Sequence, residues 1–171
     1  MQIHTKRFRD RDNFHKDPNV NGVVDLLLTD QTNAFDEVIN LVNGTYTYSE
    51  YKKQITIIKA CLLDDPNALR MLNKYCNFLE NIYKEDGRCG NLRGALLERL
   101  VYRIFEHKYG LIGSLTKSLN TNCYILIEDW QSNKTVDVFY YSDNKFMGES
   151  VECKVHPYDL ENEHVEKDYC D

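Results

Sequence analysis

The sequence predicts an α/β protein in which a mainly helical first half is followed by a small sheet. In the first half of the 171-residue chain, apolar residues recur at helical spacing. Beyond about residue 120 the pattern changes to short runs of β-branched and aromatic residues separated by polar turns. With only 3 prolines and 8 glycines, the chain has no stretch of linker composition. We therefore place the boundary by periodicity, with a helical region over 1–88 and a second region over 89–171.

The bulk composition is that of a globular protein, with 42% hydrophobic and 28% charged residues. The net charge of -6 argues against nonspecific binding to nucleic acid through charge alone. The 6 cysteines include no C-x-x-C pair, and the polar, charged start does not resemble a signal peptide. No apolar run approaches the roughly 18 residues that a membrane span needs. The composition thus predicts a cytoplasmic protein with reduced thiols and no membrane association.

The most basic window is "HTKRFRDRDNFHK" at residues 4–16, where basic residues alternate with two aspartates. Such a charged terminal stretch is typical of a solvated, partly frayed end, and we expect that here.

Helical patterns fill most of the first half. Residues 23–28, "VVDLLL", fit either a short strand or the start of a helix. A helix is expected over 33–42 and ends at an Asn-Gly pair. The next helix covers 49–63, with Ser49 as its N-cap, and stops before Pro66.

Two longer helices follow. One begins after "DDP" and carries apolar residues at helical spacing as far as Tyr83. The other covers 92–110 and ends at Gly110. Its apolar stripe is formed by Leu96, Leu97, Leu100, Val101, Ile104 and Phe105. Glu98 lies about 100° from the centre of that stripe, so we expect it at the edge of the core.

Three strands are expected over 122–130, 135–141 and 149–155, as an antiparallel meander or part of a small mixed sheet. In the third strand, "VECKV" places Glu152 and Lys154 on one face and Val151, Cys153 and Val155 on the other. Burying an acid and an amine beside a sheet costs several kcal/mol unless they pair or bind something. The arrangement therefore calls for a binding partner or a chemical role.

Asp137 lies in the middle strand, which neighbours the strand of Glu152 in a meander. If their faces match, the two carboxylates form an oxygen-rich site suited to Mg²⁺ or Mn²⁺. Lys154 can then position or deprotonate an attacking water. The E-x-K pattern alone is not specific, since it occurs at Glu50 and Lys52, at Glu106 and Lys108, and at Glu152 and Lys154. Only the third copy lies in an apolar strand pattern.

This order of parts resembles the PD-(D/E)XK nuclease superfamily over about residues 91–156: a helix with a glutamate, a strand, a strand with an aspartate, a turn, and a strand with "ECK". The resemblance implies a restriction-endonuclease-like αβββ core with a small mixed sheet. It also implies that Asp137, Glu152 and the backbone carbonyl of Cys153 are metal ligands. The aspartate follows Val136 where the family motif has proline.

The resemblance further implies that Lys154 is the catalytic lysine and that Glu98 is an auxiliary ligand or water-orienting acid. The expected activity is Mg²⁺- or Mn²⁺-dependent hydrolysis of phosphodiester bonds in nucleic acid, with DNA as the commonest substrate and restriction, defence or repair as the setting. Because the chain is acidic, we expect a second subunit, as in a homodimer, or a further domain to supply DNA affinity.

Two alternatives stay open. The family core continues after E-x-K with a helix and usually a strand, so the 89–171 core is either incomplete at its C-terminus or completed by the helical first half. The chain is otherwise a non-catalytic interaction or adaptor module on a nuclease-like scaffold, with Glu152 and Lys154 on the solvated face of an edge strand.

Overall fold

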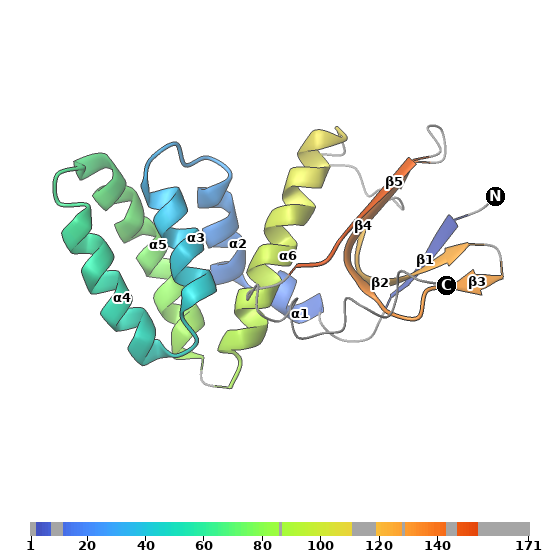
Figure 1. The fold of residues 1–171 in the computed structure, drawn as a ribbon, viewed down its shortest axis with the longest axis horizontal. Coiled ribbons are helices and arrows are strands. Elements are labelled where there is room, and N and C mark those ends of the chain that lie inside the picture. The colour runs from blue at the N-terminus through green and yellow to red at the C-terminus, as the bar shows by residue number, and fades with distance from the viewer. Residues whose placement is uncertain are drawn as a thin grey trace, which may run out of the picture.

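The computed structural model describes residues 3–7, 12–85, 87–110, 119–127, 129–142 and 147–153. Within these residues the protein is α/β, with a layer of helices beside an antiparallel sheet (Figure 1). The elements in chain order are β1 (Ile3–Arg7), α1 (Asp12–His15), α2 (Pro18–Leu27), α3 (Ala34–Gly44), α4 (Tyr48–Cys61), α5 (Pro66–Lys84), α6 (Cys89–Lys108), β2 (Leu119–Ile127), β3 (Trp130–Gln131), β4 (Val136–Ser142) and β5 (Met147–Val151).

Helices α2 to α5 and the first half of α6 enclose the larger apolar core. The ambiguous segment 23–28 belongs mostly to α2, whose valines 20, 23 and 24 are buried there. Asp17 caps this helix, accepting hydrogen bonds from the backbone amides of Asn19 and Val20, and Pro18 follows at the first helical position. The strand alternative is therefore excluded by the local capping chemistry.

The expected helix after residue 48 is present as α4, but its N-cap is Thr47, not Ser49. Thr47 accepts a hydrogen bond from the backbone N–H of Glu50, and the Glu50 carboxylate accepts one from the backbone N–H of Thr47. This reciprocal capping box satisfies amides at both ends of the first turn, which a cap at Ser49 does not do. The predicted start was wrong by two residues for that reason.

Helix α6 contacts both layers with different parts of its surface (Figure 1). Leu92 and Leu96, in its first half, pack into the helical core, whereas Phe105, in its second half, packs against the sheet. The prediction of one continuous buried stripe is wrong at Ile104, which is 45% exposed. The helix ends as expected, with Gly110 at a φ of 66°.

The sheet has the order β1-β2-β4-β5, and β3 pairs with β2 outside this path. The expectation of a mixed sheet is wrong for the described strands, because every pairing among them is antiparallel. Only a few residues separate β2 from β3 and β4 from β5, whereas a parallel pair needs a crossover of a dozen or more residues. The three predicted strands are thus present as β2, β4 and β5, but the expected bounds of the third are wrong: β5 ends at Val151, so Glu152 and Cys153 follow the strand, and residues 154 and 155 lie outside the described residues.

The expectation of a frayed N-terminus is also wrong, because residues 3–7 form β1. This strand pairs with β2, with Ile3 opposite Ile127 and Arg7 opposite Cys123. It is an edge strand, and edge strands commonly carry charged residues, which hide the apolar alternation that identifies inner strands. The N-terminus therefore contributes to the sheet formed by the second half of the chain.

Contacts between α6 and the β4–β5 hairpin fix how the two layers align. The Tyr109 ring, after α6, stacks on Tyr140 of β4 with centroids 3.8 Å apart. Lys108 Nζ donates to Glu149 Oε1 of β5 at 2.8 Å. Phe105, one turn earlier in α6, packs with Val138, two residues earlier in β4. The helix α6 and the strand β4 therefore run in the same direction.

Among the described residues no helix combines the length and apolar character of a membrane span.

Candidate carboxylate site at one end of the sheet

Asp137 lies in β4, and Glu152 is the first residue after the end of β5. The β4–β5 register places Val138 opposite Val151, so the next position along pairs Asp137 with Glu152. Directly opposed residues of an antiparallel pair project from the same face. The expected match of faces, on which a shared carboxylate site depended, therefore follows from the register.

The two acids differ in exposure. Asp137 is buried, with 8% of its surface exposed, whereas Glu152 is exposed. The backbone N–H of Cys153 donates to Asp137 Oδ2 at 2.7 Å. This bond turns the buried carboxylate toward the end of β5 and ties the E-x-K segment to β4. Cys153, whose carbonyl is the expected third ligand, thus lies beside Asp137.

Glu98 lies on the sheet-facing side of α6. The residues one turn after it (Val101 and Tyr102), two turns after it (Phe105) and three turns after it (Tyr109) all pack in the cluster between helix and sheet. At 1.5 Å per residue, Glu98 is about 16 Å along α6 from Tyr109, while Asp137 is about 10 Å along β4 from Tyr140. Because α6 and β4 run in the same sense, Glu98 lies toward the start of β4, on the side of the sheet that faces α6.

Glu98 is buried more deeply than its expected place at the core edge, with 4% of its surface exposed. Its Oε2 atom lies 2.6 Å from Nε2 of His15, which reaches it from α1. Sequence reasoning did not single out His15, and no local signal identifies it. The two residues are far apart in the chain, and α1 is only one turn long.

The position of His15 is set by a second set of hydrogen bonds. Asn21 Nδ2, in α2, donates to the backbone carbonyl of His15 at 3.0 Å. Arg99 Nε, next to Glu98 in α6, donates to Asn21 Oδ1 at 3.0 Å. The polar contacts thus form a closed path from Glu98 through His15 and Asn21 to Arg99.

Asp137 and Glu98 do not point to the same side of the sheet. Strand alternation directs Val138 toward α6 and Asp137 toward the other face, although the Asp137 carboxylate reaches Cys153 at the strand end. In the described part of the chain, no three His, Cys, Asp or Glu side chains are grouped closely enough to hold a metal ion. Lys154, the expected catalytic lysine, lies outside the described residues.

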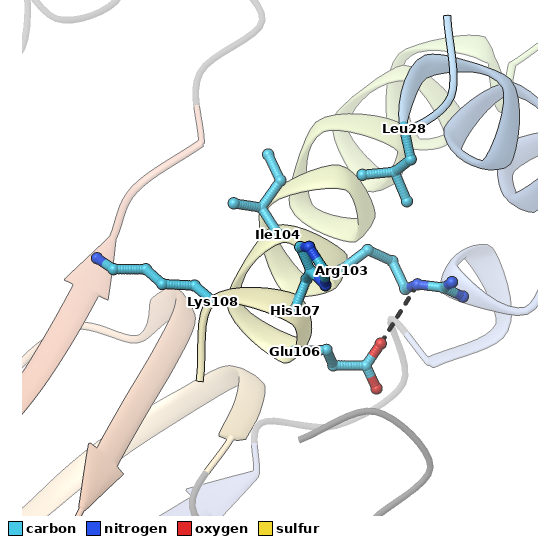
Figure 2. Close-up of a pocket in the computed structure, with 6 residues that line it drawn as sticks. All are labelled: Leu28, Arg103, Ile104, Glu106, His107 and Lys108. Carbon is cyan, nitrogen blue, oxygen red and sulfur yellow. Dashed lines mark ion pairs between the residues drawn. The ribbon is translucent and has the colours of Figure 1, made fainter. Parts of the chain in front are cut away.

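A separate pocket of about 420 Å³ lies on the opposite side of α6 (Figure 2). Its lining combines Leu28, after α2, with the α6 residues Arg103, Ile104, Glu106, His107 and Lys108. Arg103 and His107 follow Glu98 at spacings that place them about 140° and 180° around the helix from it. Arg103 Nε also pairs with Glu106 Oε2 at 3.3 Å. The pocket is therefore not part of the carboxylate site.

No family model, curated protein or solved structure matches this chain.

Proposed function

We propose that the protein is a divalent-metal-dependent nuclease that hydrolyses phosphodiester bonds, with DNA as its substrate. The proposal is carried by the β4–β5 register: continued one residue past the end of β5 at Val151, it brings Glu152 opposite Asp137. Glu98, on the stripe of α6 that faces the sheet, is the helix glutamate of this proposal. The restriction-endonuclease-like core that the sequence resembles uses a helix glutamate, a strand aspartate and an E-x-K acid in this order.

The donor chemistry of this pair fits Mg²⁺ or Mn²⁺. Mg²⁺ is usually held by one or two carboxylates while keeping several waters, so a two-carboxylate set is sufficient. Asp137 and Glu152 would hold the ion, with the carbonyl of Cys153 as a further oxygen ligand. When bound, the metal supplies a water of lowered pKa and polarises the phosphoryl oxygen.

The residues of the chain have separate roles in this proposal. The Cys153 N–H holds Asp137 in one orientation through Oδ2. Glu152 is exposed and so is accessible to substrate. Lys154 would orient the attacking water or neutralise charge that develops on the phosphate. Glu98 would orient a water from the α6 side.

The charge of the chain limits how it meets DNA. At a net charge of -6, long-range attraction to phosphate is weak. We propose that a second subunit, as in a homodimer, or a further domain supplies this attraction.

One set of observations favours a different function, an interaction or adaptor module without catalysis. Glu98 is engaged by His15, and Asp137 by a backbone amide. A scaffold that had lost catalysis would use the same contacts to satisfy its buried acids. The two functions differ in whether exposed Glu152 matters for metal binding.

Glu152→Gln gives the sharpest test because Glu152 is exposed and its amide analogue should fold normally. The full chain, Glu152→Gln and Lys154→Ala are incubated with plasmid and single-stranded DNA in Mg²⁺ or Mn²⁺, with EDTA as a further arm. Lys52→Ala, from the E-x-K copy in α4, is the matched control.

We expect EDTA-sensitive cleavage by the wild type and by Lys52→Ala. Removing a ligand or a transition-state donor should lower cleavage by Glu152→Gln and Lys154→Ala by at least about 100-fold. Cleavage that persists in both variants would refute the assignment of the site. Wild-type protein that neither cleaves DNA nor binds Mn²⁺ by calorimetry would favour the interaction module.

A further inference from the structure

We infer that the pocket between the end of α2 and α6 binds a small neutral aromatic alcohol, of the phenol or naphthol class. Its ring would lie against Leu28 and Ile104, and its hydroxyl would bond the ring of His107. The inference goes beyond the proposed nuclease and does not rest on it, because the pocket is not part of the carboxylate site.

The size and the apolar wall of the pocket are the first argument. Its volume of about 420 Å³ lies within the roughly 300–1,000 Å³ of typical ligand pockets. Leu28 and Ile104 are 39% and 45% exposed, and both line this one hollow (Figure 2). Single exposed apolar side chains are normal on a protein surface. Two that come from separate helices and meet at one pocket form an apolar surface from which a bound ligand would exclude water.

The pairing of the charged groups is the second argument, and it favours a neutral ligand. Arg103 Nε lies 3.3 Å from Glu106 Oε2 (Figure 2), and Arg103 Nη1 lies 3.8 Å from Asp25 Oδ1 in the last turn of α2. Lys108 Nζ lies 2.8 Å from Glu149 Oε1 of β5. A charged ligand would meet the like charge of one member of each pair, whereas a neutral ligand leaves the pairs intact.

The ring of His107 is the third argument. His107 follows Ile104 by three residues, so the two side chains are neighbours on α6. No described residue forms a hydrogen bond or ion pair with this ring. A neutral imidazole has one nitrogen that donates and one that accepts, and a hydroxyl can take either role. A hydroxyl therefore matches His107 in both tautomers.

The planar groups of the wall are the fourth argument, and they favour a ring over an alkyl chain. The guanidinium of Arg103 and the imidazole of His107 are both planar. Guanidinium groups stack on aromatic faces and are attracted to them electrostatically. An alkyl chain would gain only the apolar contacts with Leu28 and Ile104. An aromatic alcohol uses the apolar, planar and hydrogen-bonding groups of the pocket together.

The test is a titration of the full chain at pH 7 with 2-naphthol, naphthalene, 2-naphthoate and 2-naphthylmethylammonium. These probes share one ring system and differ in carrying a hydroxyl, no polar group, an anion or a cation. Amide NMR spectra of the isotope-labelled protein give the Kd and show which residues respond. The variants are Ile104→Ala and His107→Phe, and Ile57→Ala, at an isoleucine of α4 that is 55% exposed, is the matched control.

We expect 2-naphthol to bind with a Kd on the order of 1 mM or below, and to shift the amides of Leu28 and of residues 103–108. The other probes should bind roughly 3- to 10-fold more weakly, because each lacks the hydroxyl or carries a charge. Ile104→Ala should weaken the binding of every probe. His107→Phe should remove the preference for 2-naphthol over naphthalene, and Ile57→Ala should leave each Kd unchanged.

Three results would overturn the inference. The first is that no probe binds up to its solubility limit, and the second is that the shifted amides lie in another part of the chain. The third is that naphthalene or either charged probe binds the wild type as tightly as 2-naphthol. These comparisons use the wild-type protein, so they do not depend on how a variant folds. They are also separate from the cleavage and Mn²⁺-binding assays that test the nuclease.

Discussion

At the scale of single residues, Arg93 shows how a buried charge is satisfied by the backbone. Arg93 is 2% exposed, and its Nε atom donates to the backbone carbonyl of Val42 at 3.0 Å. Its Nη2 atom donates to the same carbonyl, and the guanidinium lies 4.8 Å from the centre of the Tyr46 ring. The planar fork therefore satisfies the end of α3 and stacks on an aromatic ring at once.

Arg93→Lys should lower the free energy of unfolding by about 1–3 kcal/mol, because an ammonium cannot reproduce the paired bonds or the stacking. Urea unfolding of the full chain measures this difference. Arg70→Lys, at an exposed position of α5, is the control and should change stability by less than about 0.5 kcal/mol. Equal effects of the two substitutions would contradict the role given to Arg93.

The thiols of the helical layer differ in environment in a way that predicts their reactivity. Burial raises the pKa of the Cys76 and Cys89 thiols, whereas Cys61 is exposed. A raised pKa lowers the thiolate fraction at a given pH, and the thiolate is the reactive form.

In a short pulse of iodoacetamide at pH 8, Cys61 should therefore be labelled on the order of tenfold faster than Cys76 or Cys89. Raising the pH should continue to increase the labelling of Cys76 and Cys89, since the raised pKa of each thiol delays its ionisation. Peptide mass spectrometry measures the rates. Labelling of Cys89 as fast as that of Cys61 would show that the helical layer opens around it.

At the scale of the elements, helix ends are decided by specific caps. Thr47 and Glu50 form the capping box of α4, and Asp65 caps α5 through the backbone N–H of Ala68. Ser49 is within α4 and has no such role. Two neighbouring hydroxyl residues of similar sequence propensity thus differ in their contribution to stability.

Thr47→Ala should destabilise the protein by about 0.5–2 kcal/mol through loss of the N-cap, and Ser49→Ala should be close to neutral. Thermal or urea unfolding of the two variants gives the comparison directly. If Ser49→Ala were the more harmful substitution, the start of α4 would be assigned wrongly.

At the scale of the whole molecule, the N-terminus and the second half of the chain form one unit. Strand β1 pairs with β2, and α1 packs on α6, although a helical layer separates these partners in sequence. The buried contact between His15 and Glu98 joins the same two parts of the chain, because His15 comes from α1 and Glu98 from α6. The helices from α2 to α5 are packed around a core of their own.

Deleting residues 1–7 should therefore expose the edge of β2 and raise the rate of hydrogen exchange in its amides. Amides of α4, in the helical core, should exchange as in the full chain, which provides an internal control. Hydrogen–deuterium exchange followed by mass spectrometry measures both. Unchanged protection of β2 would show that β1 does not contribute to the stability of the sheet.

The sequence by itself determined the elements whose signals are local. The helical spacing predicted α3 to α6, the turn at Gly110 and the shift to three short strands, because periodicity and caps act over a few residues. The period of two in a strand also predicted a shared face for Asp137 and Glu152, and that these two acids form a site stays a prediction.

Tertiary structure decided what depends on contacts distant in sequence. The pairing of β1 with β2 converts a charged N-terminal window into an edge strand. The two packing faces of α6 leave Ile104 exposed and bury Glu98 against the sheet side. The contact of Glu98 with His15 joins a one-turn helix to α6. Each of these three features requires a partner that a local sequence pattern cannot identify, because burial and pairing arise only when the layers assemble.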